Sequence, residues 1–496
     1  MIRNTKKRVI TLFFAITLTI INCINVYAVD TVPTDELKFA AEQRKSLPVD
    51  TNEIVGWPNG PAIGAQSAVL MDVNTGTLLY SKNPHDQLYP ASTTKLITAL
   101  LTIENTTMDE VVTFSRDAVW NIDRGSSHLS IDVGEQMTVE ECLYGLLLAS
   151  ANEVAYALAE HVGGDLDTFV NMMNERAAKL GCTDTHFSNA NGLPREDHYT
   201  SSYDLALIAR ECFSNETLCS IAGTVKYTIG PTNKQSEERP ISNHHKLLPT
   251  FKYEYEGFIG GKTGFTQDAR QTLVSCAEKN GMRLVCVIMK EESPYQFIDT
   301  IDLFDYGFSS FNVKNIAENE TRYNLDSSSF FKTKYDILGS TKPILSINPS
   351  GNVVIPKSMT FADLDTDIEY SNSPSDYIAI IKYSVDGNPT GSTTIDYADN
   401  GTKAFEFSNI LKNHSSDTTV AYSPEIKTVF VDVRKVIALF VIIIVVIFVV
   451  FFTYDLIKTY IASAKRNHRL TRNRYKKRSE NKLKLFKRRF KPDDKL

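Results

Sequence analysis

The sequence predicts an α+β protein: a domain whose β-sheet is flanked by a helical block, then a small all-β domain and one C-terminal transmembrane helix. The first prediction rests on strand-like alternation near residues 66–80 and again over 224–290, on either side of mainly helical patterning. Short strand-like runs broken by Gly, Pro, Asn and Asp follow Phe311 and predict the all-β domain. An uncharged apolar run at 436–454 predicts the membrane span.

The first 28 residues have the parts of a cleaved secretory signal peptide. Basic residues at 3–8 precede an apolar run, and small residues stand at the outer and last positions of Val26-Tyr27-Ala28, before a cleavage site after Ala28. A retained N-terminal anchor is the alternative. Prolines recur over 29–60, so we predict an extended leader there, ahead of the first domain at 61–311.

The elements of the first domain follow from its patterning. Strands are predicted at 66–73 and 77–80, joined by a turn that contains Gly76. Further strands lie within 224–290, so both ends of the domain are expected to complete one sheet. Helices are predicted between and after these strands, at 92–104, 138–163, 166–180, 202–213 and 296–311.

The chain beyond the first domain divides into three further parts and a tail. Strand-like runs at 344–347, 353–356 and 377–383 predict the β-rich domain, 312–411. The remaining segments are a membrane-proximal linker at 412–435, the transmembrane helix at 436–454 and a basic tail at 455–496.

Charge sets the expected orientation in the membrane. The tail 455–496 holds sixteen Lys or Arg and four Asp or Glu, a net charge of +12, whereas 29–454 carries −22. Basic flanks stay in the cytoplasm, so we expect a cytoplasmic tail and an extracytoplasmic body. The tail should attract anionic lipid, and nucleic-acid or protein binding by the tail is the less favoured alternative.

Cysteine and histidine give no sign of a metal site. The six cysteines after Cys23 have no metal-like spacing, and we interpret them as mostly buried thiols with one or two disulfides possible. His244 and His245 are adjacent and would point apart on a strand. No metal or cofactor is expected.

A hydroxyl and an amine are predicted to meet on one short helix. Ser92 and Lys95 are three residues apart after Pro90, so a helix beginning near Ala91 places both on one face. A serine becomes a nucleophile when a base removes its proton, and a lysine can be that base when burial or nearby cations keep it neutral. The Ser-x-x-Lys spacing alone is a weak signal, because most such pairs are solvated helix surface.

Two further motifs follow in the chain. A very apolar helix over 138–163 is interrupted at Ser150-Ala151-Asn152, where polar groups need partners or cap a helix. Lys262 and Thr263 lie on a predicted strand and could offer an ammonium and a hydroxyl to a carboxylate, while Gly264 would let a substrate backbone approach. The alternative for the latter motif is a glycine turn with an exposed lysine.

Together the three motifs resemble those of low-molecular-mass penicillin-binding proteins, the serine-type D-alanyl-D-alanine carboxypeptidases. The resemblance runs from about Ile63 to Phe311 and implies a β-lactamase/transpeptidase-like fold. The matching segments also include Ser67–Leu70, Thr75-Gly76, Tyr80–Asn83, Pro90–Lys95, Asn189–Pro194, Tyr203–Ala206 and Gly261–Thr266.

The resemblance implies a substrate and a role for each residue. Ser92 would attack the bond between two terminal D-alanines of a peptidoglycan stem peptide, with Lys95 as base and Ser150 as proton carrier to the leaving amine. β-Lactams would acylate Ser92 as inhibitors. Substrate binding would fall to Asn152, Lys262, Thr263, Gly264 and Phe265, with the N–H groups of Ser92 and Phe265 as oxyanion hole.

Two departures and several alternatives stay open. After Lys-Thr-Gly the family usually continues to Ala-Gly, whereas this chain has Ala269-Arg270, which affects the edge of the substrate pocket. A spanning helix and a basic tail replace the family's usual amphipathic C-terminal helix. D,D-endopeptidase or β-lactamase activity of the same serine, and a non-catalytic membrane-tethered wall-binding or signalling protein, are the alternatives.

Overall fold

The computed structural model describes residues 34–123, 125–323, 345–371 and 377–397. No helix in these ranges is long and apolar enough to cross a membrane. Four predicted segments lie outside the described residues: the signal peptide 1–28, the linker 412–435, the span 436–454 and the tail 455–496.

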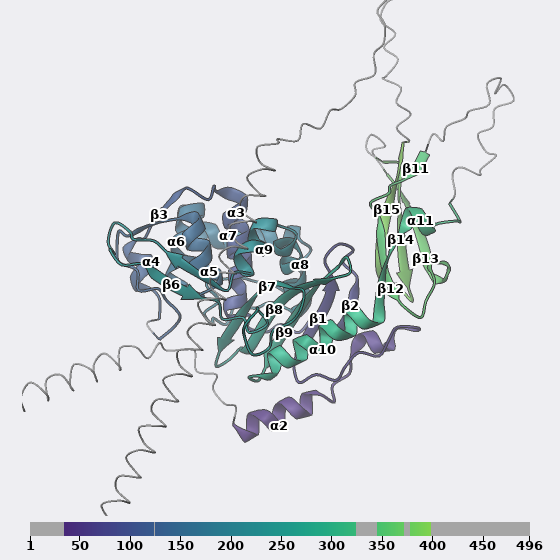
Figure 1. The fold of residues 1–496 in the computed structure, drawn as a ribbon, viewed down its shortest axis with the longest axis horizontal. Coiled ribbons are helices and arrows are strands. Elements are labelled where there is room, and N and C mark those ends of the chain that lie inside the picture. Colours follow the sequence, from purple (N-terminus) through teal and green to yellow (C-terminus); the bar gives the residue numbers. More distant parts are fainter. Residues whose placement is uncertain (1–33, 124, 324–344, 372–376, 398–496) are drawn as a thin grey trace, which may run out of the picture. The chain divides into compact units, whose positions relative to one another are not determined.

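A five-stranded antiparallel sheet forms the centre of the first domain, in the order β2-β1-β9-β8-β7 (Figure 1). Its first two strands come from the start of the domain and the other three from its end, which confirms the predicted sheet built from both ends. Ser67 of β1 pairs with Met289 of β9. The strands are β1 Ser67–Asp72, β2 Leu78–Lys82, β7 Phe258–Thr266, β8 Arg270–Lys279 and β9 Met282–Glu291.

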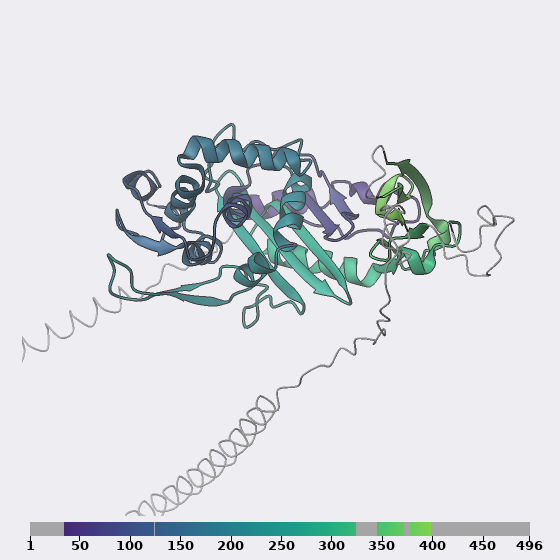
Figure 2. The same ribbon diagram turned by 90° about the horizontal axis from the view of Figure 1, so that it is seen from above.

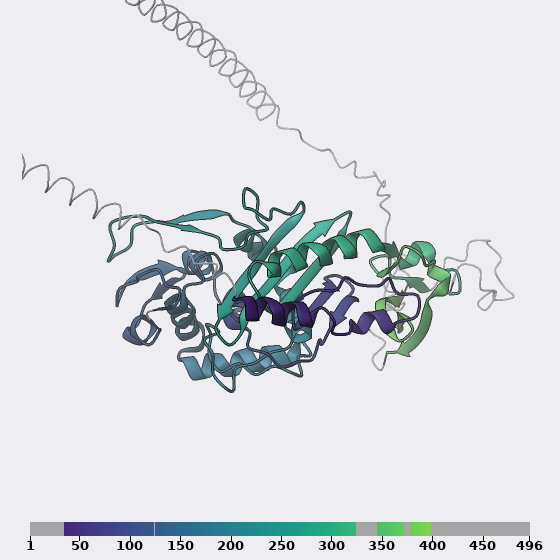
Figure 3. The same ribbon diagram turned by 90° about the horizontal axis from the view of Figure 1, so that it is seen from below.

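The two faces of this sheet pack against different helices because side chains alternate along each strand. Leu70 and Cys286 face the core shared with α10 (Tyr295–Ser310), which crosses the sheet in Figure 3. Val69 and Val287 face the opposite core, shared with the helical block. Because both faces of the sheet are buried, the sequences of its strands are nearly continuous apolar runs.

The helical block contains the elements that carry two of the three motifs. The predicted helix at 92–104 begins as a 3₁₀ turn, η2 (Ala91–Thr94), before α3 starts at Lys95. The predicted helix at 138–163 is two helices that meet around Ser150, whose φ is +60°. The α-helices of the block are α3 Lys95–Asn105, α4 Arg116–Trp120, α5 Val139–Leu147, α6 Asn152–Gly163, α7 Leu166–Lys179, α8 Ser202–Phe213 and α9 Glu216–Ala222.

Two short hairpins complete this part of the structure. β3 (Val111–Thr113) pairs with β4 (Gln136–Thr138) at the edge of the helical block. β5 (Lys226–Ile229) pairs with β6 (Arg239–Ser242), and this hairpin extends away from the central sheet in Figure 2.

A second, six-stranded sheet follows the first domain. Its order is β10-β12-β15-β14-β13, with β11 paired to β15. Short helical turns accompany it at α11 (Ile316–Asn319) and η4 (Phe361–Asp363). The strands are β10 Phe311–Asn315, β11 Leu345–Ile347, β12 Asn352–Pro356, β13 Asp365–Tyr370, β14 Ala379–Val385 and β15 Asn388–Tyr397.

The prediction of an extended leader over 29–60 was wrong for its described part. Residues Asp35–Arg44 form helix α2, and Asp50–Glu53 form a 3₁₀ turn, η1. The prolines flank these helices and do not interrupt them. Thr34 caps α2 by accepting a hydrogen bond from the N–H of Leu37, and acidic residues fill the first turn, so local signals favour a helix.

The described cysteines are free thiols, so none of the disulfides considered possible forms among them. Burial is the largest cause that raises the pKa of the Cys286 thiol, which keeps it protonated and unreactive. The six are Cys142, Cys182, Cys212, Cys219, Cys276 and Cys286.

Candidate active site

The Nζ atom of Lys95 lies 3.0 Å from the Oγ atom of Ser92. Ser92 is the second residue of η2 and Lys95 opens α3, so the turn of helix between them brings both side chains to one face. Ala91 has φ +49°, which bends the chain sharply into η2. Ser92 is partly exposed and Lys95 is fully buried, so the hydroxyl is reachable and the amine is shielded from water.

The amine of Lys95 has two further partners. Nζ donates to the Oδ1 atom of Asn152 at 2.6 Å and to the carbonyl oxygen of Asn191 at 2.6 Å. Burial is the main cause that lowers the pKa of Lys95 well below its usual value, and nearby Lys262 lowers it further, against the opposing effect of Glu153. A neutral amine has two N–H donors and one lone pair. In that neutral form the two donors would be taken by Asn152 and Asn191, and the lone pair would face the Ser92 hydroxyl.

A second lysine–serine pair lies beside the first. Nζ of Lys262 donates to Oγ of Ser150 at 3.0 Å and to the carbonyl oxygen of Thr263 at 2.8 Å. Ser150 lies between α5 and α6 in a left-handed conformation, and its hydroxyl accepts from Lys262 there. Burial lowers the pKa of Lys262 to about 7. The lysine therefore changes charge near neutral pH.

Close backbone contacts fix the position of η2. A Cβ atom added at Gly264 would lie 2.9 Å from the backbone nitrogen of Ser92, so β7 passes directly against the turn that carries the serine. The hydroxyl of Thr272 on β8 donates to the carbonyl of Pro90 at 2.9 Å. On the other side, a Cβ atom at Gly192 would lie 1.8 Å from the carbonyl oxygen of Ala91. Larger residues at either glycine would displace η2.

The loop before β4 supports Asn152. Nδ2 of Asn152 donates to Oγ of Ser126 at 2.7 Å, and its backbone N–H donates to the carbonyl of Ser127 at 2.9 Å. The neighbouring Glu153 carboxylate accepts from the N–H of Leu129 at 2.5 Å. These bonds hold the amide group of Asn152 with its oxygen toward Lys95.

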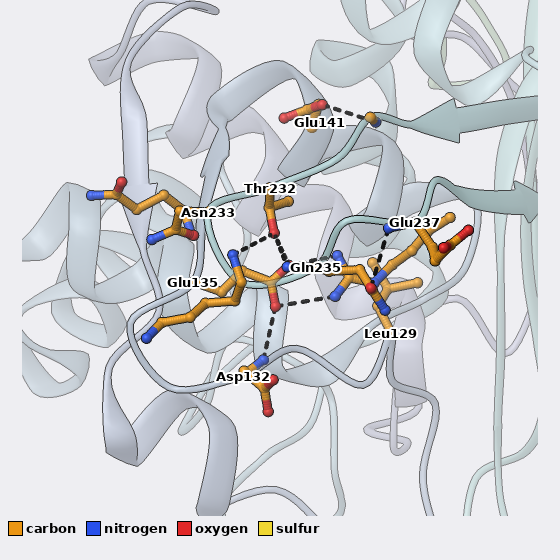
Figure 4. A network of polar contacts seen from close by, with 12 residues as sticks. Leu129, Asp132, Glu135, Glu141, Thr232, Asn233, Gln235 and Glu237 are labelled. Atoms are coloured by element: carbon orange, nitrogen blue, oxygen red, sulfur yellow. Dashed lines mark hydrogen bonds and ion pairs between the residues drawn. The ribbon is translucent and has the colours of Figure 1, made fainter.

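The same loop is tied to the β5–β6 hairpin by the polar network in Figure 4. The fully buried carboxylate of Glu135 accepts from both Nη atoms of Arg239, at 2.6 and 3.1 Å, and from the hydroxyl of Thr232 at 2.7 Å. The N–H of Asp132 donates to the same carboxylate at 2.9 Å. This network joins the β5–β6 hairpin to the loop before β4, the loop that also contains Ser126.

The sequence analysis assigned no role to Asn191, although its carbonyl holds Lys95. A backbone carbonyl can act as acceptor whatever the side chain of its residue, so the sequence does not mark it. The turn that positions this carbonyl does depend on a side chain: Oδ1 of Asn189 accepts from the N–H groups of Asn191 and Gly192, at 3.2 and 2.7 Å. Gly192 has φ +87°, a conformation suited to glycine. The Asn189–Pro194 segment contributes to the site through its backbone.

The structure brings together Ser92, Lys95 and Asn152 in one hydrogen-bonded group, and Ser150 with Lys262 in another. Gly264 lies against Ser92. The other two predicted residues continue the same strand β7: Thr263 is partly exposed and Phe265 is 39% exposed. In the described ranges, no three His, Cys, Asp or Glu side chains are grouped to hold a metal ion.

Comparison with known proteins assigns the chain to a family. The family model described as D-alanyl-D-alanine carboxypeptidase matches residues 55–293. The chain is 33% identical over 294 residues to D-alanyl-D-alanine carboxypeptidase DacF of Bacillus subtilis, which covers 58% of this chain and 73% of that protein. It is also 33% identical over 258 residues to DacB2 of Mycobacterium tuberculosis, covering 51% of this chain and 84% of that protein.

A solved structure with a similar fold is penicillin binding protein 6B from Escherichia coli. The TM-score is 0.51 at 25% identity, over 69% of this chain and 98% of that one. The sheet-and-helix fold expected from the three motifs is thus confirmed, as is the family resemblance. The chain belongs to the D-alanyl-D-alanine carboxypeptidase family.

Proposed function

We propose that this protein is a serine-type D-alanyl-D-alanine carboxypeptidase that removes the terminal D-alanine from peptidoglycan stem pentapeptides. The observation that carries the proposal is the meeting of two lysine–serine pairs, Lys95 with Ser92 and Lys262 with Ser150, at 3.0 Å each. Each pair joins an amine of lowered pKa to a hydroxyl. Such pairs provide a nucleophile with its base and a route for the proton to the leaving group.

Acylation begins when Oγ of Ser92 attacks the carbonyl carbon between the two D-alanines. The hydroxyl proton passes to the lone pair of neutral Lys95. The tetrahedral intermediate collapses, its C–N bond breaks, and a proton delivered through Ser150 completes the amine of the leaving D-alanine. The acyl group remains on Ser92 as an ester until water hydrolyses it and restores the serine.

The remaining residues bind and orient the substrate. The ammonium of Lys262 and the hydroxyl of Thr263 receive the terminal carboxylate, and Asn152 holds a peptide amide. The N–H groups of Ser92 and Phe265 stabilise the oxyanion, each contributing about 3–4 kcal/mol by comparison with other acyl-transfer sites. Gly264 gives the substrate backbone room beside η2, since a Cβ there would crowd Ser92. No metal or organic cofactor takes part in these steps.

A fluorescent penicillin and a pentapeptide test the proposal together. The wild-type protein is expected to form a covalent, denaturation-resistant adduct at Ser92 and to release D-alanine from the pentapeptide. Ser92→Ala should abolish both, and Ser214→Ala, which removes a hydroxyl at the C-terminal end of α8, should keep the adduct. No adduct on the wild type, or equal labelling of Ser92→Ala, would rule out this nucleophile. Rapid hydrolysis of the penicillin would indicate a β-lactamase, and cleavage of cross-linked dimers would indicate an endopeptidase.

We also propose that the enzyme is exported and anchored by a single C-terminal span at 436–454, with the tail 455–496 in the cytoplasm near anionic lipid. The charge of +12 on the tail against −22 on 29–454 supports this orientation. Protease added to intact cells without a wall should digest the body and spare an epitope on the tail. Protection of the body or digestion of the tail would contradict the proposed topology.

A further inference from the structure

The first residue of β8, directly after the turn from β7, is an arginine in a conformation that favours glycine. Arg270 has φ +55°, in the left-handed region that L side chains adopt rarely. It lies at the position where the sequence departs from the usual Ala-Gly of the family, four residues after Thr266. A long charged side chain in such a backbone position needs compensating contacts, and the structure provides them.

The guanidinium of Arg270 forms a forked ion pair with Glu292. Its Nε atom lies 3.1 and 3.2 Å from the two carboxylate oxygens, and Nη2 lies 2.7 Å from Oε2. The Glu292 side chain is 2% exposed, and the backbone N–H of Glu292 donates to Glu291 at 2.7 Å. Glu292 directly follows β9, which has neighbours on both sides in the sheet. The ion pair therefore ties the end of the β7–β8 hairpin to an interior strand.

The same guanidinium also contacts β7 and its turn. Its Cζ atom lies 5.6 Å from the centre of the Phe265 ring, and Nη1 donates to Oε1 of Gln267 at 3.2 Å. Arg270 pairs with Thr266 in the β7–β8 register, next to Phe265. The Phe265 ring is 39% exposed, so the guanidinium supplies packing that the core does not.

β7 is a terminal strand of the sheet; α9 packs against it at Gly260, and η2 lies against it at Gly264, beside Ser92. Lys262, in the middle of the strand, and Gly264, two residues later, are buried. Phe265 and Thr266 come after them, where the Arg270 contacts are concentrated. A shift confined to this end would move the Phe265 backbone relative to Ser92 more than it moves Lys262, because Lys262 has its own bonds to Ser150 and to the Thr263 carbonyl.

We propose that Arg270 and Glu292 are positioning residues for the acylation of Ser92. They hold the end of β7 so that the N–H of Phe265 stays aligned with the developing oxyanion. This inference rests on the proposed function and deepens it. An oxyanion donor acts on the transition state, whereas Lys262 binds the carboxylate in the ground state, so the pair should affect the rate of acylation more than prior binding.

The test uses the full-length chain in detergent and separates the acylation rate by a β-lactam from its preceding non-covalent binding. Arg270→Lys keeps the positive charge but cannot form the two-pronged contact of a guanidinium with the Glu292 carboxylate. Glu292→Gln removes the negative charge that Arg270 contacts. Each is expected to slow acylation about 10- to 100-fold, since loss of a whole oxyanion donor costs about 10²- to 10³-fold. The non-covalent dissociation constant should stay within about threefold, as expected for an effect confined to the transition state.

Arg283→Gln provides the matched control. Arg283 donates to the Glu278 carboxylate at 2.7 Å, and this ion pair joins β8 and β9 at the far end of their hairpin. The Arg283→Gln variant should leave the acylation rate unchanged. The double variant Arg270→Gly/Glu292→Gln removes both charges and relieves the left-handed backbone, so it should fold and still acylate slowly.

Three results would overturn the inference: unchanged acylation in the double variant, an equal loss in Arg283→Gln, or weakened binding with an unchanged rate. Failure of the wild type to be labelled at Ser92 is a different outcome, because it would reject the proposed function itself. Slower acylation in the Arg270 and Glu292 variants, with thermal unfolding temperatures matched to the Arg283→Gln control, supports the inference.

Discussion

Lys262 and Ser150 lie 112 residues apart in the chain, yet the amine of one donates to the hydroxyl of the other at 3.0 Å. One residue belongs to the edge strand β7 and the other to the junction of α5 and α6. The site therefore depends on the packing of the sheet against the helical block. Disturbing either side should separate the proton route from the nucleophile.

Replacing Lys95 by methionine should slow acylation of Ser92 about 10²- to 10⁴-fold, the usual contribution of a general base. Methionine keeps an unbranched side chain, one atom shorter than that of lysine, and lacks the amine that faces Ser92. Stopped-flow labelling with a fluorescent penicillin measures the rate. Lys82→Met is the matched control: Lys82 is also buried and donates to the carbonyls of Arg44 and Ile63, both at 2.7 Å. It should lose about 1–3 kcal/mol of stability and keep its acylation rate if folded.

The value of kcat/KM for D-alanine release should fall as the pH rises above about 7. Lys262 must be protonated to bind the substrate carboxylate, and burial lowers its pKa to about 7, so the binding form is lost as pH rises through that value. Lys262→Arg should move this limb to higher pH, because arginine stays charged. An unmoved limb in an active Lys262→Arg enzyme would assign it to another group.

Gly192→Ala should reduce both stability and acylation. The added Cβ would lie 1.8 Å from the Ala91 carbonyl, next to Ser92, in a residue with φ +87°. We expect more than about 2 kcal/mol of destabilisation, since the left-handed backbone alone costs about 1–2 kcal/mol. Gly281→Ala separates the two effects: its φ is +75° and nothing lies within 4 Å of the added atom. Gly281→Ala should lose only the roughly 1–2 kcal/mol that the left-handed backbone costs and should keep its acylation rate. Urea unfolding measures the loss of stability in both variants.

Glu291 should make the protein less stable as pH rises. Burial, and then the nearby Asp299, raises the pKa of Glu291 to about 9, so the folded state favours the neutral carboxyl. Its contribution to stability is complete below the unfolded pKa, near 4.5, and is lost as pH rises toward 9. Unfolding temperatures of wild type and Glu291→Gln between pH 5 and 9 measure this effect, and the variant should show the shallower decline. Parallel profiles would contradict it.

The sequence predicted the parts of the site that depend on local spacing. Ser92 and Lys95 share a helical turn, and the polar break at Ser150 appears within an otherwise apolar helix. Bringing Lys262 to Ser150 could be predicted only through the family resemblance, since no local pattern joins residues so distant. The sheet built from both ends of the domain was predictable because its strands alternate clearly on each side of the helices.

Other features could not be predicted because their signals lie in the backbone or in tertiary contacts. The carbonyl of Asn191 holds Lys95 without any side-chain requirement of its own. Helix α2 was not predicted because the prolines around it favour an extended chain, whereas the Thr34 cap that starts it is a single short-range contact. The partner of Arg270 is Glu292, which looks from the sequence like a charged residue at the exposed end of a strand.

The pairing of Ser67 with Met289 has a consequence for the order in which the protein matures. A chain emerging from the ribosome completes the helical block and the Ser92–Lys95 turn well before β9 is synthesised. Until then β1 and β2 lack their neighbour, and Lys262 has no sheet to hold it. The reactive serine then gains its full set of partners only after nearly all of the domain has arrived.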